Sequence, residues 1–213
     1  MRPRRLLLAA AAVSGVLALT AGSAGATPRT PDPAAAPTSI AGLLLSDSAG
    51  DDADGFDRRW NDYDIVTQAV LAFPDLTRAA SDPGTLTVFA PTDRAFRILV
   101  WDLTHTWPRT EKETFDAVVG LGLDTVKTVL TYHILGSAVS YADAVKANGA
   151  SIPTLQGGSI TVDVKGSKRH PSVRLIDLDP NARNPRVIAA NVGGQLTNGY
   201  VHGIDRVLRP LDL

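Results

Sequence analysis

The ten residues TVFAPTDRAF, numbered 87–96, carry the strongest structural information in this sequence. The β-branched and aromatic residues of 85–90 predict a buried strand. Pro91 ends this strand, because proline has no N–H to offer a sheet. Thr92 or Asp93 then provides a side-chain oxygen for the free N–H groups of a helix that runs to about Leu103. The stretch therefore predicts a strand-to-helix joint within a hydrophobic core.

Helices are expected on both sides of this joint. Apolar residues at helical spacing predict a helix over 62–73, with Asp62 or Asp64 as its N-cap. Pro74 opens a short helix that ends before the turn at 82–84. Three more helices are expected over 111–121, 123–132 and 140–147.

The C-terminal third of the chain reads as strands. Short β-rich runs cover 152–155, 159–164, 173–178, 186–190 and 199–208, with glycine pairs at 157–158 and 193–194 as turns between them. The last run has apolar residues on both faces, which is typical of a strand buried on two sides. Because helices come first and strands later, with one early strand, the order predicts an α+β fold.

The N-terminus has the features of a secretory signal peptide. Arg2, Arg4 and Arg5 precede an apolar run over 6–19, and the small residues of 24–26 provide a cleavage site after Ala26. The apolar run is shorter than the ~20 residues of a membrane span. The paired arginines leave both the general and the twin-arginine export routes open. Residues 1–26 are thus expected to be removed, giving a secreted, extracellular protein that is at most loosely associated with a cell surface.

The expected mature chain is acidic and has no cysteine. Removal of 1–26 takes away three arginines and no acidic residue, which changes the formal net charge from −1 to −4. No basic block remains to offset phosphate charge, so nucleic-acid binding is not expected. Residues 27–39 contain four prolines among alanine and threonine and are expected to form a flexible spacer.

Residues 40–61 are expected to be an N-terminal extension that contains an Asp-rich loop over 47–57. Carboxylates suit calcium, but the spacing does not match a calcium-binding loop. With Gly55 as the central glycine, the first ligand would be Gly50 and the last would be Asn61, where a Glu is required. A solvated loop is the favoured interpretation, and no metal site is predicted.

Three segments resemble the fasciclin domain family: TVFAPTDRAF (87–96), YHIL (132–135) and NGYVHGIDRVLRP (198–210). The stretch TLQGGSITVDV (154–164) is also similar to that family. Their order and spacing place a fasciclin-like domain at 62–211. The resemblance implies a β-wedge of about seven strands with flanking helices, and a role in extracellular adhesion.

The motif residues have mainly structural interpretations. They are Thr87, Phe89, Pro91, Thr92, Asp93, Phe96, Asn198, Gly199, His202 and Asp205. In this family adhesion is tied to the Tyr-His pair, which makes Tyr132 and His133 the binding candidates. Adhesion in this family is also tied to an Asp-Ile element just before the terminal Asn-Gly. When the sequence is aligned on Asn198-Gly199, the positions of that element are Gly193 and Gly194, which argues against an integrin as the partner.

The residues do not indicate an active site. The four histidines are far apart in the sequence, there is no cysteine, and no G-x-S-x-G motif is present. His202 and Asp205 lie three residues apart in a predicted strand, so they point to opposite faces. We therefore expect no catalytic residue, no enzyme activity and no cofactor.

Three functions follow from these observations. The first is a secreted adhesion or surface-interaction module whose partner is a protein or glycan at a cell surface or in the matrix. The second is a carrier or receptor for a small glycan or lipid, bound in a groove between helices and sheet. The third is a secreted hydrolase, which requires a serine hydroxyl within hydrogen-bond reach of His133 or His202.

Overall fold

The computed structural model describes residues 38–47 and 54–211. The signal peptide and the spacer up to residue 37 lie outside the described residues, as does most of the Asp-rich loop. In the described residues the helices are α1 (Ile40–Asp47), α2 (Asp64–Leu71), α3 (Pro74–Ser81), α4 (Asp93–Thr104), α5 (Glu111–Val119), α6 (Leu123–Tyr132) and α7 (Tyr141–Lys146). The strands are β1 (Leu86–Pro91), β2 (Ile134–Leu135), β3 (Ser151–Pro153), β4 (Ser159–Ser167), β5 (His170–Ile176), β6 (Val187–Ala189) and β7 (Gly199–Ile204).

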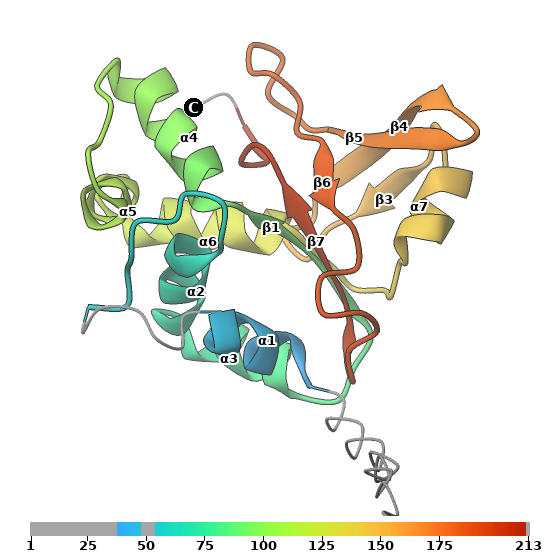
Figure 1. Cartoon of the computed structure of the whole chain (residues 1–213), viewed down its shortest axis with the longest axis horizontal. Helices are drawn as coiled ribbons and strands as arrows, with labels where there is room; N and C mark the ends of the chain where they lie inside the picture. The colour runs from blue at the N-terminus through green and yellow to red at the C-terminus, as the bar shows by residue number, and fades with distance from the viewer. Residues whose placement is uncertain (1–37, 48–53, 212–213) are drawn as a thin grey trace, which may run out of the picture. The chain divides into compact units, whose positions relative to one another are not determined.

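The strands form two sheets. The first has the order β2-β1-β7-β6, in which β1 and β7 run parallel and the outer pairs are antiparallel. The second is the antiparallel sheet β3-β4-β5. Figure 1 shows α1 to α6 gathered on one side of β1 and β7, with β3, β4, β5 and α7 on the other. The predicted α+β class with about seven strands is confirmed.

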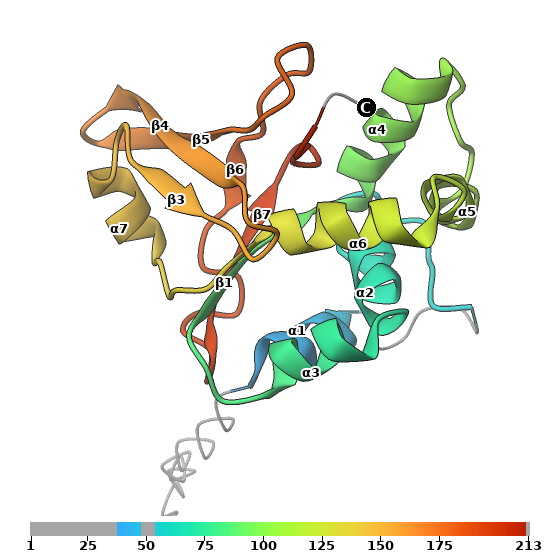
Figure 2. The ribbon, with the colours of Figure 1, turned by 180° about the vertical axis from the view of Figure 1, so that it is seen from behind.

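Two clusters of apolar side chains hold these layers together. The larger lies between α1 to α6 and the first sheet and includes Ile65, Phe96 and Val201. The smaller packs the first sheet against the second and includes Phe89 and Ile204. Neighbouring residues of β1 and β7 face opposite clusters, which explains why each strand has apolar residues on both of its faces. The reverse view in Figure 2 shows the same division.

The segment expected to be an extension contributes to the main core. α1 buries Ile40, Ala41 and Leu44 against α2 and α3. The apolar run at 40–45 is therefore a helix of the domain core. β2 was not expected either, because two residues are too few to give a periodic pattern.

The predicted cap of α2 is wrong. The N-cap position is Tyr63, and its side chain makes no capping bond. The N–H groups of Asp64 and Ile65 instead donate to the carboxylate of Asp93, at 3.3 and 2.9 Å. Thr92 caps its own helix, α4, by accepting from the Ala95 N–H. Adjacent residues of the motif thus begin two different helices.

Candidate binding surface

The Tyr132–His133 pair is buried at the end of α6. The Tyr132 hydroxyl donates to the Ser159 carbonyl at 2.7 Å. His133 donates from Nδ1 to the Val129 carbonyl at 2.7 Å, and its Nε2 accepts from the Leu208 N–H at 2.9 Å. Burial lowers the pKa of His133 to about 4 and raises the pKa of Tyr132 to about 12. Partner binding by this pair stays a prediction, and neither side chain is exposed.

His202 has a similar environment within β7. Its Nδ1 accepts from the Asn191 N–H at 3.2 Å, and its Nε2 donates to the Val139 carbonyl at 2.9 Å. Burial lowers its pKa, and Phe89 lies beside the ring, with centroids 5.8 Å apart. Because His133 and His202 both use their two ring nitrogens on the backbone, neither is placed to activate a serine hydroxyl.

The remaining motif residues connect segments that are distant in the sequence. The Thr87 hydroxyl donates to the Ser137 carbonyl and accepts from the Val139 N–H. Pro91 closes β1 and Phe96 packs in the main core. Asp205 accepts from the Arg186 N–H at 2.7 Å and pairs with its guanidinium. Each of these contacts ties one part of the fold to another.

Asn198 and Gly199 join the start of β7 to the helices. Asn198 Oδ1 accepts from the Ile40 N–H at 2.9 Å, and Nδ2 donates to the carbonyls of Ala80 and Asp82. Gly199 has a φ of 139°, and a Cβ there would collide with the Leu86 carbonyl. Glycine is therefore required at 199, because the backbones of β7 and β1 approach closely there. Asn198 is required for its bonds to the helices, in addition to the turn that the pair makes.

The exposed surface of greatest chemical interest lies elsewhere, around α4. All three tryptophans of the chain gather there, although they come from the segment before α2, from α4 and from the loop after it. The Trp101 and Trp107 rings stack, with centroids 5.0 Å apart and planes 8° apart. Arg97 places its guanidinium 4.3 Å from the Trp60 centroid and 5.4 Å from the Trp107 centroid.

We call these three tryptophans, together with Arg97 and His105, the tryptophan–arginine surface. His105 ends α4 in the left-handed conformation, with a φ of 55°, and its ring meets the edge of Trp101. Arg97 Nε donates to the Pro108 carbonyl at 2.9 Å, which fixes the loop that carries Trp107. The Trp107 side chain is 47% exposed. Aromatic rings and arginine held rigidly at a surface are the residues that protein interfaces favour.

Two open clefts flank this surface. One, of about 460 Å³, is lined by Trp60, Arg94, Arg97, Ile98 and Trp107. The other, of about 420 Å³, contains Trp101 and His105 together with Arg183 and Arg206. Both clefts contain arginines, so the surface suits a partner with acidic groups.

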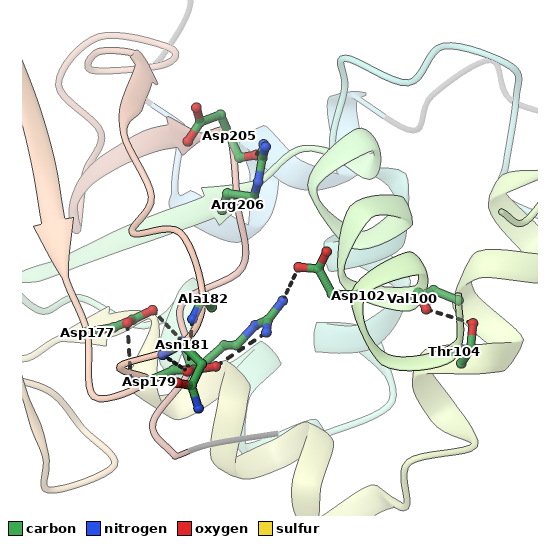
Figure 3. A network of polar contacts seen from close by, with 10 residues as sticks. Val100, Asp102, Thr104, Asp177, Asp179, Asn181, Ala182, Asp205 and Arg206 are labelled. Atoms are coloured by element: carbon green, nitrogen blue, oxygen red, sulfur yellow. Dashed lines mark hydrogen bonds and ion pairs between the residues drawn. The ribbon is translucent and has the colours of Figure 1, made fainter. Parts of the chain in front are cut away.

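A polar network forms the floor of the second cleft. Arg209 is buried and binds Asp102 on α4 at 2.6 Å and Asp179 at 3.3 Å. Figure 3 shows Asp102 and Asp179 on separate segments of the chain, with Asp179 bonded to the backbone of Asn181 and Ala182. Asp177 accepts from the Arg209 N–H. The network holds α4, and with it the tryptophans, against the end of the chain.

Sequence reasoning did not single out this surface. The available signal was the presence of only three tryptophans, two of them six residues apart across a helix end. Their proximity to Trp60 depends on how α2 and α4 pack, which no local pattern reveals.

Comparisons with known proteins identify the family of this chain. The family model "Fasciclin domain" matches residues 62–210. The chain is 28% identical over 148 residues to Protein sll1483 of Synechocystis sp., an alignment that covers 70% of this chain and 67% of that protein. A solved pair of domains from the insect cell adhesion molecule Fasciclin I has 22% identity and a TM-score of 0.47. That alignment covers 68% of this chain and spans 43% of the solved chain.

Among residues 38–47 and 54–211 we find no helix with the length and hydropathy to cross a bilayer. The match to the family model covers more than half of the chain and includes the strand-to-helix joint, the Tyr-His pair and the Asn-Gly turn. The chain therefore belongs to the fasciclin domain family.

Proposed function

We propose that this protein is a secreted attachment module that binds a protein at a cell surface or in the matrix through its tryptophan–arginine surface, without catalysis. Fasciclin domains are typically related to adhesion. The observation that carries the proposal is the convergence of all three tryptophans around Arg97 on one exposed face. Hot spots of protein interfaces are enriched in tryptophan and arginine.

The alternative of a small-ligand carrier receives less support from the structure. The cavity between α1, α3, α6 and β1 is apolar and has a volume of about 20 Å³. Such a space accommodates roughly one water molecule. A glycan or lipid would need a far larger cavity than this one, so the structure gives no support to a carrier site at this place between helices and sheet.

Attachment of beads that carry the mature chain to producing cells or their matrix tests the binding proposal. Many copies on one bead supply the multivalency that a single module lacks. Trp107→Ala should weaken attachment by roughly 30-fold, because truncating a hot spot costs about 2 kcal/mol. Ile188→Ala is the matched control, since Ile188 lies on β6 and is 53% exposed.

Equal attachment of wild type, Trp107→Ala and Ile188→Ala would reject the tryptophan–arginine surface as the binding face. Loss of attachment after enzymatic removal of surface glycans, with surface proteins intact, would replace the protein partner by a glycan. Secretion is tested by N-terminal mass spectrometry of protein from the culture medium. The expected first residue is Thr27, and an intact Met1 would contradict removal of the signal peptide.

A further inference from the structure

Carboxyl groups from separate parts of the chain meet where three helices begin. Asp64, Asp93 and Glu111 are the first residues of α2, α4 and α5, which pack against one another. One carboxylate oxygen each from Asp62, Asp93 and Glu111 lies within 4.8 Å of the others, and the same is true of Asp57, Asp62 and Asp64. Because Asp62 belongs to both groups, the five residues form one connected set, which we call the helix-start cluster.

Glu111 has no ion-pair partner among the described residues although it is almost fully buried. It is 1% exposed, neither carboxylate oxygen makes a hydrogen bond of normal geometry to the described residues, and the backbone of Asp57 acts on it only by lowering its pKa. Asp93 differs, because its oxygens accept two backbone N–H groups of α2. The N-cap of α5 is Thr110, so Glu111 is not needed to cap its own helix. A buried carboxyl group without an ion-pair partner is stable when it is protonated or when a cation binds beside it.

The charges at this place support the same view. Burial and the nearby Asp57, Asp62 and Asp64 raise the pKa of Glu111 to about 7. Burial and the adjacent Asp62 also raise the pKa of Asp93. Without a cation the cluster therefore holds protons, which a bound cation would replace. Three helix N-termini, equivalent to roughly 1.5 positive charges, also favour negative groups at this place.

We propose that the helix-start cluster is a binding site for one hard divalent cation, with Ca²⁺ preferred, held by Asp62, Asp93 and Glu111. The donors are all carboxylate oxygens, which suit Ca²⁺ or Mg²⁺ rather than Zn²⁺. Ca²⁺ takes roughly 6–8 oxygen ligands in a flexible geometry, whereas Mg²⁺ is usually held by one or two carboxylates and keeps several waters. Three carboxylates that can contribute one oxygen each therefore favour Ca²⁺.

Asp62 is the member of the cluster that reaches an open cleft. This cleft, of about 600 Å³, is also lined by Trp60 and by Arg58, Arg59 and Arg94. Asp57 and Asp64 lie close enough to Asp62 to complete the coordination. A bound cation would join the starts of α4 and α5 to the segment that carries Trp60. The spacing of the Asp-rich loop did not predict this site, because its ligands come from three separate segments.

The test uses the mature chain freed of metal with EDTA. Calcium is titrated by isothermal calorimetry and by the shift in melting temperature, since a ligand of the native state raises that temperature. We expect saturable binding of one Ca²⁺ and a higher melting temperature. Terbium, used as a luminescent substitute for calcium, should be excited through Trp60 and displaced by Ca²⁺.

Glu111→Gln should weaken Ca²⁺ binding by at least about tenfold, because it removes a direct ligand without changing the side-chain shape. Asp116→Asn is the matched control on the same helix, where Asp116 is exposed and pairs with Lys112. It should leave the affinity unchanged. Asp62→Asn provides a second variant that should lose binding, and circular dichroism checks that each variant is folded.

The proposal fails if Ca²⁺ produces neither heat nor a melting shift up to about 10 mM, well above the ~1 mM of weak extracellular sites. The helix-start cluster would then hold protons rather than a metal ion. It also fails if the double variant Asp51→Asn/Asp52→Asn in the Asp-rich loop abolishes binding while Glu111→Gln retains it.

Discussion

His133 and Glu111 are almost equally buried, at 3% and 1% exposed. His133 bonds through both ring nitrogens, whereas within the described residues Glu111 bonds through neither carboxylate oxygen. The other motif residues follow His133. The side chains of His202 and Asn198 are also bonded to the backbone, while Glu111 lies among other carboxyl groups. The residues that identify the family thus build the fold, and a site for a ligand is to be sought where buried groups lack protein partners.

The largest effect is expected at Asn198. Asn198→Ala would leave the Ile40 N–H and the carbonyls of Ala80 and Asp82 without their side-chain partner. Each buried polar group left unsatisfied costs about 1–3 kcal/mol. We expect the free energy of unfolding to fall by about 4 kcal/mol in urea titrations, and exposed Gln195→Ala to change it by less than about 0.5 kcal/mol. Similar values for both variants would mean that the fully bonded region is not what stabilises the fold.

A pH dependence is expected from His133. Its folded pKa of about 4 lies below the ordinary value of 6.5. As the pH falls, His133 therefore binds a proton in the unfolded chain before it does so in the folded chain. The contribution of neutral His133 to the free energy of unfolding is complete above pH 6.5 and is lost as the pH falls towards 4. The loss approaches about 3 kcal/mol. The difference in unfolding free energy between wild type and His133→Gln should shrink over this range, since other groups titrate alike in both proteins. A constant difference would contradict neutral burial of His133.

The smallest effect concerns Asp93, which belongs to the family motif and to the helix-start cluster. In metal-free buffer Asp93→Asn should stay within about 1 kcal/mol of wild type, because the amide oxygen still accepts from Ile65 and the amide resembles a carboxyl group whose pKa is raised and which holds its proton. Asp93→Ala removes the cap of α2 and should lower the unfolding free energy by about 2 kcal/mol. If the Asn variant loses as much as the Ala variant, the negative charge itself is required even without a cation.

Much of the fold could be predicted because its signals are local. Apolar spacing, prolines and glycine turns gave α2 to α7 and most strands within a few residues. The misses share a cause. β2 exists through its pairing with β1, α1 is held by core packing, and Asp93 caps a helix that begins 29 residues earlier. Trp60 and Trp107 also come to the same arginine, Arg97, only after folding. The candidate binding and cation sites are both products of such distant contacts, so spacing rules could not find them.

The parallel pairing of β1 with β7 has a consequence for how the protein is made. Thr87 pairs with Tyr200, so the central strand of the first sheet arrives only when nearly all of the described chain has been synthesised. Contacts between such distant residues form slowly, because a long loop must close first. A nascent chain would therefore remain unfolded until its last strand emerges. For a chain exported by the general route, one of the two routes left open above, this delay would keep the protein in a form that a secretion channel can thread before β7 completes the sheet.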